Sequence, residues 1–157
     1  MAGIARLVNG SVHNKAKEEI NLNDRKYKGK IYGLYFGAKW CEPCRNFTTL
    51  LTELYQEFHR EKKFKIIYIS SDNDEESFNE YRKNMPWLAV DFKQQKLRED
   101  LSTKFDVTGL PKLVLIDGDT GKTICTNARE QILYLDTEGK NFPWKSTTKP
   151  SSKSSSK

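Results

Sequence analysis

The sequence of 157 residues is poor in cysteine and histidine, with three of the former and two of the latter, and it has no long apolar run. Small secreted domains stapled by disulfides usually carry more cysteines, in even numbers, so three cysteines favour a reducing compartment. No stretch approaches the roughly 18 apolar residues of a membrane span, and the N-terminal sequence lacks the apolar core of a secretory signal. We therefore expect a cytoplasmic or nuclear protein with no membrane partner.

The charge is positive but not organised for one class of ligand. Lysine and arginine number 27 against 21 acidic residues, for a formal net charge of +6, and part of the excess lies in the C-terminal "KSTTKPSSKSSSK". Nucleic-acid binding would favour basic residues interleaved with exposed aromatics on one face, a pattern we do not find, so no specific nucleic-acid partner is expected. The tail composition predicts disorder over residues 146–157. Residues 1–145 are then expected to form a single domain, acting as a monomer, in which residues 1–29 are an N-terminal extension with short edge strands.

Two apolar runs flank an amphipathic segment. The runs over 31–38 and 64–70 are typical of strands buried on both faces. Between them, apolar residues recur at the spacing of one helical face: Phe47, Leu50, Leu51, Leu54, Tyr55 and Phe58. This β-α-β unit predicts two parallel strands joined by a right-handed crossover.

Shorter elements are predicted around this unit. The segments "ARLV" (5–8) and "EEINL" (18–22) are expected as short edge strands, and 72–84 and 93–105 as helices. "GLPKLVLID" (109–117) predicts a strand that forms an antiparallel hairpin with "KTICT" (122–126). "NAREQILYL" (127–135) predicts a final helix capped by Asn127 or Thr126. The expected fold class is α/β, with a central mixed sheet flanked by helices on both faces.

Two cysteines lie where the first long strand meets the long helix. In "WCEPCR", Cys41 stands at the junction and Cys44 lies one turn inside the helix, while Pro43 occupies the first turn, where its missing N–H costs nothing. Unpaired N–H groups at a helix start lower the pKa of a thiol, and the thiolate is the attacking form. Lys39 would add to this effect and Glu42 would oppose it. We expect Cys41 to attack a disulfide and Cys44 to resolve the mixed disulfide.

Two other interpretations of the CxxC pair, a zinc site and a structural disulfide, have less support. A single CxxC supplies two of the four ligands of structural zinc, and Cys125, His13 and His59 show no matching spacing, so no metal is expected. A purely structural disulfide would close too small a loop to add much stability. Isolated in an apolar strand, Cys125 is expected to act as a small core residue.

Pro111 stands at the entrance of the strand predicted in "GLPKLV". A proline there removes one backbone donor at a position that tolerates the loss. With the CxxC beside it, a cis Leu110–Pro111 bond would also present the backbone of Leu110 to a bound peptide. The element order makes this second interpretation the better one.

Five blocks appear in order along the chain: "LYFGAKWCEPCRNFT", "MPWLAVDF", "LSTKFDVTGLPKLVLID", "TNAR" and "NFPW". Together they resemble the tryparedoxin and nucleoredoxin branch of the thioredoxin superfamily, from about residue 30 to residue 144. CxxC alone would be a weak signal, whereas five blocks in register are a specific one.

The resemblance implies a thioredoxin-like fold and a dithiol–disulfide oxidoreductase without a cofactor. It makes Cys41 the exposed nucleophile, Cys44 the resolving thiol, Trp40 the active-site tryptophan and Pro111 the cis-proline. Tyr35 stands where thioredoxins proper have a buried carboxylate and tryparedoxins a tyrosine. A neutral tyrosine is a poor proton acceptor near neutral pH, so deprotonation of Cys44 then depends on water or another group.

The sequence departs from tryparedoxins at several positions. Glu42 places a charge in a motif that is CPPC in that family, and Ser71 and Asn73 stand where a tryptophan and an acid help to engage trypanothione. Arg129 matches a family position near the same site, and Leu110 replaces an isoleucine. The implied partners are disulfide-containing proteins such as peroxidases, and a dithiol or reductase donor: trypanothione, glutathione or thioredoxin reductase.

A different class of function fits the same fold. A thioredoxin-fold binding module would use Trp40, Leu110 and the surface around them to hold a partner without catalysis. Such a module has no need of a thiol pair with a lowered pKa, and the sequence therefore favours the enzyme.

Overall fold

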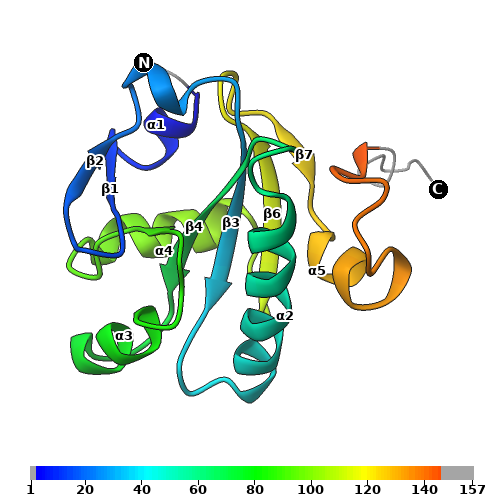
Figure 1. The fold of residues 1–157 in the computed structure, drawn as a ribbon. Helices are drawn as coiled ribbons and strands as arrows, with labels where there is room; N and C mark the ends of the chain where they lie inside the picture. Colours follow the sequence, from blue (N-terminus) through cyan, green and yellow to red (C-terminus); the bar gives the residue numbers. More distant parts are fainter. Residues whose placement is uncertain (1–2, 146–157) are drawn as a thin grey trace.

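A computed structural model describes residues 3–145 of the chain, and the tail expected to be disordered, residues 146–157, lies outside the described residues. Seven strands form one mixed sheet in the order β2-β1-β5-β4-β3-β6-β7, with helices packed against it (Figure 1). The strands are β1 (Ser11–His13), β2 (Glu19–Asn21), β3 (Ile31–Gly37), β4 (Phe64–Ser70), β5 (Leu88–Ala89), β6 (Lys112–Asp117) and β7 (Thr123–Cys125). The helices are α1 (Gly3–Leu7), α2 (Glu42–Phe58), α3 (Glu75–Arg82), α4 (Gln95–Lys104) and α5 (Ala128–Glu130), with a 3₁₀ turn η1 (Arg25–Tyr27) and a short π-helix η2 (Gln131–Leu135).

The centre of the sheet is the predicted β-α-β unit. β3 pairs in parallel with β4 through seven residue pairs from Ile31↔Phe64 to Gly37↔Ser70, and it pairs antiparallel with β6 on its other side. The hairpin of β6 and β7 is antiparallel, as predicted. Six of the seven residues of β3 and six of β4 are buried, because helices cover both faces of these strands.

Helices lie on both faces of the sheet, as expected for this fold class. α2, α3 and α5 pack on one face, where Phe47, Leu51, Phe78, Tyr81 and Ala128 join one buried cluster. α1 and α4 cover the other face, where Ile4, Ala5, Leu97 and Leu101 join a second cluster. Helix α4 begins and ends within the predicted segment, and α3 is capped by Asp74, whose carboxylate accepts the N–H of Ser77 at 2.8 Å.

The prediction of a strand over 5–8 was wrong. These residues belong to helix α1 and the turn after it, where Ile4, Ala5 and Val8 share the buried face of one helical turn. The helix ends because Asn9 and Gly10 adopt positive φ, and the N–H of Gly10 donates to the carbonyl of Ala5 at 2.7 Å. The predicted edge strand over 18–22 is confirmed as β2, which pairs with β1 at the edge of the sheet.

The final helix is also less regular than predicted. A three-residue α5 leads into the π-helix η2, and Tyr134 and Leu135 are exposed instead of forming a buried stripe. Asn127 occupies the cap position, but its Oδ1 accepts a hydrogen bond from Cys125 Sγ at 3.0 Å and does not cap the helix. Leu50 departs from expectation for a simpler reason: it lies at the margin of the apolar stripe of α2 and is exposed.

Candidate active site

The CxxC pair lies where the loop after β3 leads into α2, at the lower end of the sheet in Figure 1. Cys41 is the N-cap of α2, with extended backbone angles, and its sulfur accepts the N–H of Cys44 at 3.2 Å. Cys41 and Cys44 form a disulfide in this structure. Pro43 lies in the first turn, exposed to solvent like Glu42. The helix start therefore supplies a hydrogen-bond donor to the sulfur of Cys41, which favours its thiolate when the pair is reduced.

The two sulfurs differ in access. Cys41 is 6 % exposed, whereas Cys44 is fully buried. Cys41 is thus more covered than the exposed nucleophile that the resemblance implies, but it is the one member of the pair that retains contact with solvent. Cys125, the third cysteine, is buried in β7 and takes no part in the pair.

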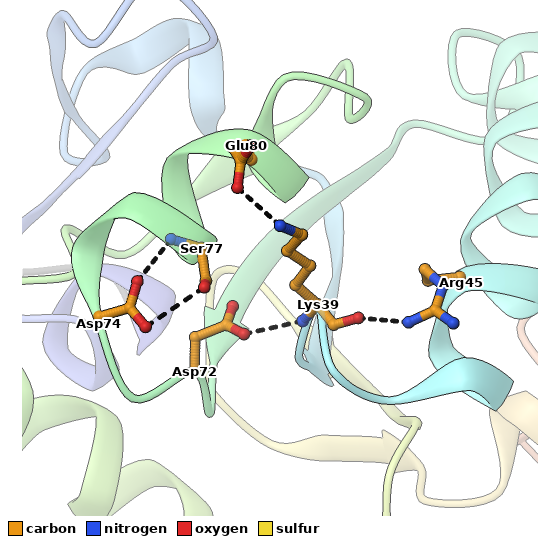
Figure 2. A network of polar contacts seen from close by, with 6 residues as sticks. All are labelled: Lys39, Arg45, Asp72, Asp74, Ser77 and Glu80. Carbon is orange, nitrogen blue, oxygen red and sulfur yellow. Dashed lines mark hydrogen bonds and ion pairs between the residues drawn. The ribbon is translucent and has the colours of Figure 1, made fainter.

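Lys39 does not lie free beside the thiol. Its Nζ forms an ion pair with Glu80 on α3 at 2.6 Å, and this contact raises the pKa of Lys39. The side chain is therefore directed toward α3, and its charge is countered there (Figure 2). The sequence suggested that the charge of Lys39 lowers the pKa of the Cys41 thiol, and the ion pair with Glu80 reduces this effect.

The backbone of Lys39 is held on both sides. Its N–H donates to the buried carboxylate of Asp72 at 2.8 Å, and its carbonyl accepts from Arg45 Nη1 at 2.5 Å (Figure 2). Asp72 is itself fixed by the hydroxyl of Ser70, at 2.9 Å. These contacts tie the loop before Cys41 to the end of β4 and to the first turn of α2. Neither Asp72 nor Arg45 was singled out from the sequence, where single charged residues near a motif carry no signal of this kind.

Behind the pair lies a set of buried hydroxyls. The Tyr35 hydroxyl donates to the carbonyl of Cys44 at 3.1 Å and lies 2.6 Å from Thr48 Oγ1, which lies 2.6 Å from the hydroxyl of Tyr81. Burial raises the pKa of Tyr35, so this side chain is neutral at physiological pH. The sequence pointed to Tyr35 but missed the other two. Thr48, four residues after Cys44 on an otherwise apolar helix face, was the available signal.

Trp40 and the Pro111 segment flank the pair. Trp40 is 61 % exposed, and its indole N–H approaches the carbonyl of Ser71 at 3.4 Å. The Leu110–Pro111 bond is cis, as predicted, and the pairing of Phe36 with Lys112 sets Pro111 opposite the end of β3, which leads into the CxxC. Leu110 is partly buried between the two core clusters.

Arg129 belongs to the Pro111 side of the site. Its Nη1 donates to the carbonyl of Pro111 at 3.3 Å, while its buried Nε has no hydrogen-bond partner. Arg129 and Pro111 line an open cleft of about 330 Å³ that also includes Lys112 and Glu130. The structure thus brings Arg129 to the cis-proline.

Neither a metal centre nor a membrane span is found within residues 3–145. No group of three or more His, Cys, Asp and Glu side chains in this part of the chain is arranged to hold a metal ion. Its helices are also too short or too polar to cross a bilayer.

Comparison with known proteins agrees with this geometry. The family described as Thioredoxin-like matches residues 29–123. Tryparedoxin of Trypanosoma brucei brucei is 40 % identical over 145 residues, which cover 92 % of this chain and 99 % of that protein. A solved structure of tryparedoxin II complexed with glutathionylspermidine superposes with a TM-score of 0.86 at 37 % identity, covering 91 % of this chain and 99 % of the other.

Nucleoredoxins are similar over a shorter stretch. Nucleoredoxin of Xenopus laevis is 38 % identical over 118 residues, which cover 74 % of this chain but only 28 % of that longer protein. The thioredoxin-like match over residues 29–123 includes both cysteines of the CxxC, which form a disulfide in this structure. The chain therefore belongs to the tryparedoxin and nucleoredoxin group of the thioredoxin superfamily and is a dithiol–disulfide oxidoreductase.

Proposed function

We propose that this protein reduces disulfides of partner proteins, with Cys41 as the attacking thiol and Cys44 as the resolving thiol. The observation that supports this assignment is the difference in solvent exposure between the two cysteines. Cys41, the N-cap of α2, is 6 % exposed to solvent, whereas Cys44 is fully buried. A partner sulfur can approach only the exposed member. The N–H that Cys44 donates to the sulfur of Cys41 favours the thiolate needed for attack.

The reaction proceeds in two exchanges. The Cys41 thiolate attacks one sulfur of the partner's disulfide, which breaks, and the other partner sulfur leaves as a thiolate. The Cys44 thiolate then attacks the sulfur of Cys41, the mixed disulfide breaks, and the second partner sulfur leaves. Two electrons pass from the dithiol to the partner, whose thiolates take protons from water. The product is the Cys41–Cys44 disulfide present in this structure.

The surface around Cys41 fits a protein partner. Trp40 offers an exposed apolar ring, and the cis Leu110–Pro111 segment lies opposite the end of β3, which leads into the CxxC. Arg129, anchored to the carbonyl of Pro111, adds a cation to the cleft on that side. We propose disulfide-containing proteins such as peroxidases as the partners. We also place the reaction in the cytoplasm or nucleus, because three cysteines without a disulfide framework suit a reducing compartment.

For the electron donor we propose a low-molecular-weight thiol of the glutathionylspermidine type. A similar tryparedoxin II has been solved with glutathionylspermidine bound, and this chain matches 99 % of its length. Ser71 and Asn73 replace the residues that tryparedoxins use near this ligand, so recognition here would rely more on Arg129, which lines the open cleft beside Pro111. A panel of donors tests this: glutathionylspermidine, trypanothione, glutathione, and NADPH with thioredoxin reductase, each assayed against the oxidised protein.

A trapping experiment tests the cysteine roles. Cys44→Ser should accumulate mixed disulfides through Cys41 when exposed to oxidised partner protein, because the second exchange cannot occur. Cys41→Ser is the matched control and should trap nothing. If Cys44→Ser forms no adducts, or if Cys41→Ser forms them instead, the assignment is overturned.

A second assay separates the enzyme from a binding module. The wild-type protein should accelerate the reduction of insulin by dithiothreitol, read as turbidity, and the double Cys41→Ser, Cys44→Ser variant should not. Partner binding that survives in the double variant, combined with a wild-type protein that gives no acceleration, would favour the module.

A further inference from the structure

Two basic segments that are far apart in the sequence lie side by side at the end of the sheet opposite the CxxC. Residues 25–30 contain η1 and precede β3, and residues 60–65 follow α2 and include the start of β4. The N–H of Ile31 donates to the carbonyl of Lys63 at 2.9 Å, which joins the two segments. Both lie at the upper end of the sheet in Figure 1, whereas the CxxC lies at its lower end. Together the two segments form the basic end of the molecule.

The basic end carries more positive charge than the chain as a whole. Its segments, "RKYKGK" and "REKKFK", hold eight lysines and arginines and one acid, Glu61, for a formal charge of +7. The net charge of the whole chain is +6, so the rest of the chain is close to neutral. None of the ion pairs between side chains of residues 3–145 includes a residue of the basic end. Its charge is therefore not balanced by salt bridges within this part of the chain.

The carboxylates that border the basic end are bonded to backbone groups. Asp24 Oδ1 accepts the backbone N–H of Lys26 at 3.2 Å, where it caps η1. Asp119 Oδ1 accepts the backbone N–H of Gly29 at 3.1 Å. These two acids stabilise the loop before β3, and the ammonium groups of the neighbouring lysines are left facing solvent or one another.

Three of the lysines gather near one aromatic ring. The Nζ atoms of Lys26 and Lys65 lie 5.5 and 5.6 Å from the centroid of the Tyr27 ring. Burial lowers the pKa of Lys65, and the positive charges of Lys30 and Lys26 lower it further. The Tyr32 hydroxyl donates to the carbonyl of Tyr27 at 2.8 Å and fixes this residue over β3. Like charges held this close favour a bound anion, which would relieve their repulsion.

The surroundings of these lysines distinguish between classes of anionic partner. Single-stranded nucleic acids stack their bases on open aromatic rings, but the Tyr27 ring is already in contact with two ammonium groups. Helices that bind to membrane surfaces add apolar side chains to the basic ones. The large apolar side chains exposed in residues 3–145 lie outside the basic end: Trp40, Leu50, Tyr134 and Leu135.

The type of cation points in the same direction. Six of the eight basic residues are lysines, whose ammonium groups are point charges on flexible stems. They lack the planar fork with which arginine recognises phosphate in a fixed geometry. Lysines of this kind fit carboxylates that are spread along an extended chain.

We propose that the basic end binds an acidic segment of a partner polypeptide. Between the basic end and the loop that holds Cys41, β3 runs for seven residues, a length of about 20 Å at the usual rise per residue. A segment bound at the basic end therefore leaves the sulfur of Cys41 uncovered, and the protein can hold a partner while its cysteines exchange. The surface is separate from the cysteines, so its assignment does not depend on the roles proposed for Cys41 and Cys44.

Fluorescence anisotropy with a short labelled peptide of alternating glutamate and serine tests this surface. The wild-type protein should bind the peptide, and binding should weaken as salt is added, because exposed charges are screened over about 10 Å at 0.1 M salt. A variant that neutralises four lysines of the basic end should bind at least about tenfold more weakly. The four substitutions are Lys26→Gln, Lys28→Gln, Lys62→Gln and Lys65→Gln. If the wild-type protein does not bind the peptide at low salt, the proposal is wrong.

A matched variant separates the basic end from the net charge of the protein. It neutralises four exposed lysines elsewhere, with the same change in net charge: Lys15→Gln, Lys83→Gln, Lys93→Gln and Lys104→Gln. This variant should bind the peptide like the wild-type protein. Arginine at the four substituted positions of the basic end should restore binding, which shows that charge and not folding is responsible. Equal losses in the two glutamine variants would assign the binding to overall charge and overturn the proposal.

Two other probes test the class of partner in the same buffer. One is a single-stranded oligonucleotide of mixed sequence, and the other is a vesicle containing phosphatidylserine. We expect both to bind more weakly than the acidic peptide. If either binds more tightly than the peptide and is lost in the variant of the basic end, that class of partner replaces the acidic segment.

The cysteine variants keep this test independent of the proposed function. The double Cys41→Ser, Cys44→Ser variant should bind the peptide like the wild-type protein, and a loss of binding would contradict a surface separate from the cysteines. The variant of the basic end should reduce 2-hydroxyethyl disulfide, which is uncharged, at the wild-type rate. A wild-type protein that binds the peptide but reduces no disulfide would overturn the proposed function and leave the binding surface standing.

Discussion

The two faces of the sheet are built from different side chains, although they share the same strands. On the face under α2 and α3, Tyr35 and Tyr68 project into a cluster rich in aromatic rings, several of them with hydroxyls. On the face under α1 and α4, the alternate residues Leu34 and Ile67 join a mainly aliphatic cluster. Period-two alternation allows one strand to serve both. The comparison shows that the redox pair belongs to the aromatic face. Within the described residues, this face holds the bonded hydroxyls of Tyr35, Thr48 and Tyr81 next to Cys44.

The largest effect on stability is expected on the aliphatic face. Leu34→Ala removes a fully buried side chain from the central strand. Large-to-small changes of this kind lower the free energy of unfolding by about 2–5 kcal/mol, through lost burial and the cavity left behind. Urea denaturation measures the loss. Folded Leu34→Ala should still form the mixed disulfide at the wild-type rate, and a slowed first exchange would show that the two faces are not separable.

Alkaline pH should weaken the aromatic face next. Burial raises the pKa of Tyr55, on α2, from 10.0 to about 12. The raised pKa means that the folded state holds its proton more tightly, so this stability is fully present below pH 10 and is lost between about pH 10 and pH 12. A shift of two units corresponds to about 3 kcal/mol.

Denaturation midpoints measured from pH 8 to pH 12 check this expectation. Tyr55→Phe should lose less stability across that interval than the wild-type protein, because the substituted ring has no proton to release. Equal pH dependence in the two proteins would assign the alkaline loss to other buried tyrosines.

The smallest effect is expected at the exposed end of the site. Glu42 lies in the first turn of α2, exposed, between the two cysteines. Its carboxylate disfavours the nearby thiolate, so Glu42→Pro should lower the pKa of the Cys41 thiol and make the reduction potential less negative. Equilibration with glutathione buffers gives the potential, and the pH dependence of alkylation by iodoacetamide gives the thiol pKa. An unchanged or more negative potential would contradict this view of Glu42.

The parts of the fold predicted correctly are those with strong periodicity. The runs that became β3 and β4 and the stripe on α2 are long enough for hydrophobic spacing to decide the element type. The segment 5–8 was assigned wrongly because four residues do not distinguish alternation from one turn of helix. The final helix was predicted over nearly the right residues, but its π-helical part could not be predicted from apolar spacing, and the bond from Cys125 that occupies Asn127 is invisible in the sequence.

The site divides in a similar way. Cys41, Cys44 and Pro111 could be located from motif and spacing alone, because each has a chemical type that the position requires. Tyr81 could not be located in this way, because its contact with Thr48 between α2 and α3 is created only by tertiary packing. Thr48 left a signal, as a polar residue on an otherwise apolar helix face, but the sequence did not show its partners. The ion pair of Lys39 with Glu80 could not be predicted for the same reason, because the two residues are 41 positions apart in the sequence.

The hold on Lys39 has a consequence for how long mixed disulfides survive. Because Asp72 and Arg45 fix both backbone groups of the residue two before Cys41, the sulfur of Cys41 stays within reach of Cys44 when a partner is attached (Figure 2). Well-oriented groups within one molecule react as if present at about 10⁵–10⁸ M. No thiol free in a cell can compete with a neighbour at that effective concentration. The protein should therefore release each partner by its own internal exchange, and its conjugates with partners should be transient at every ordinary thiol concentration.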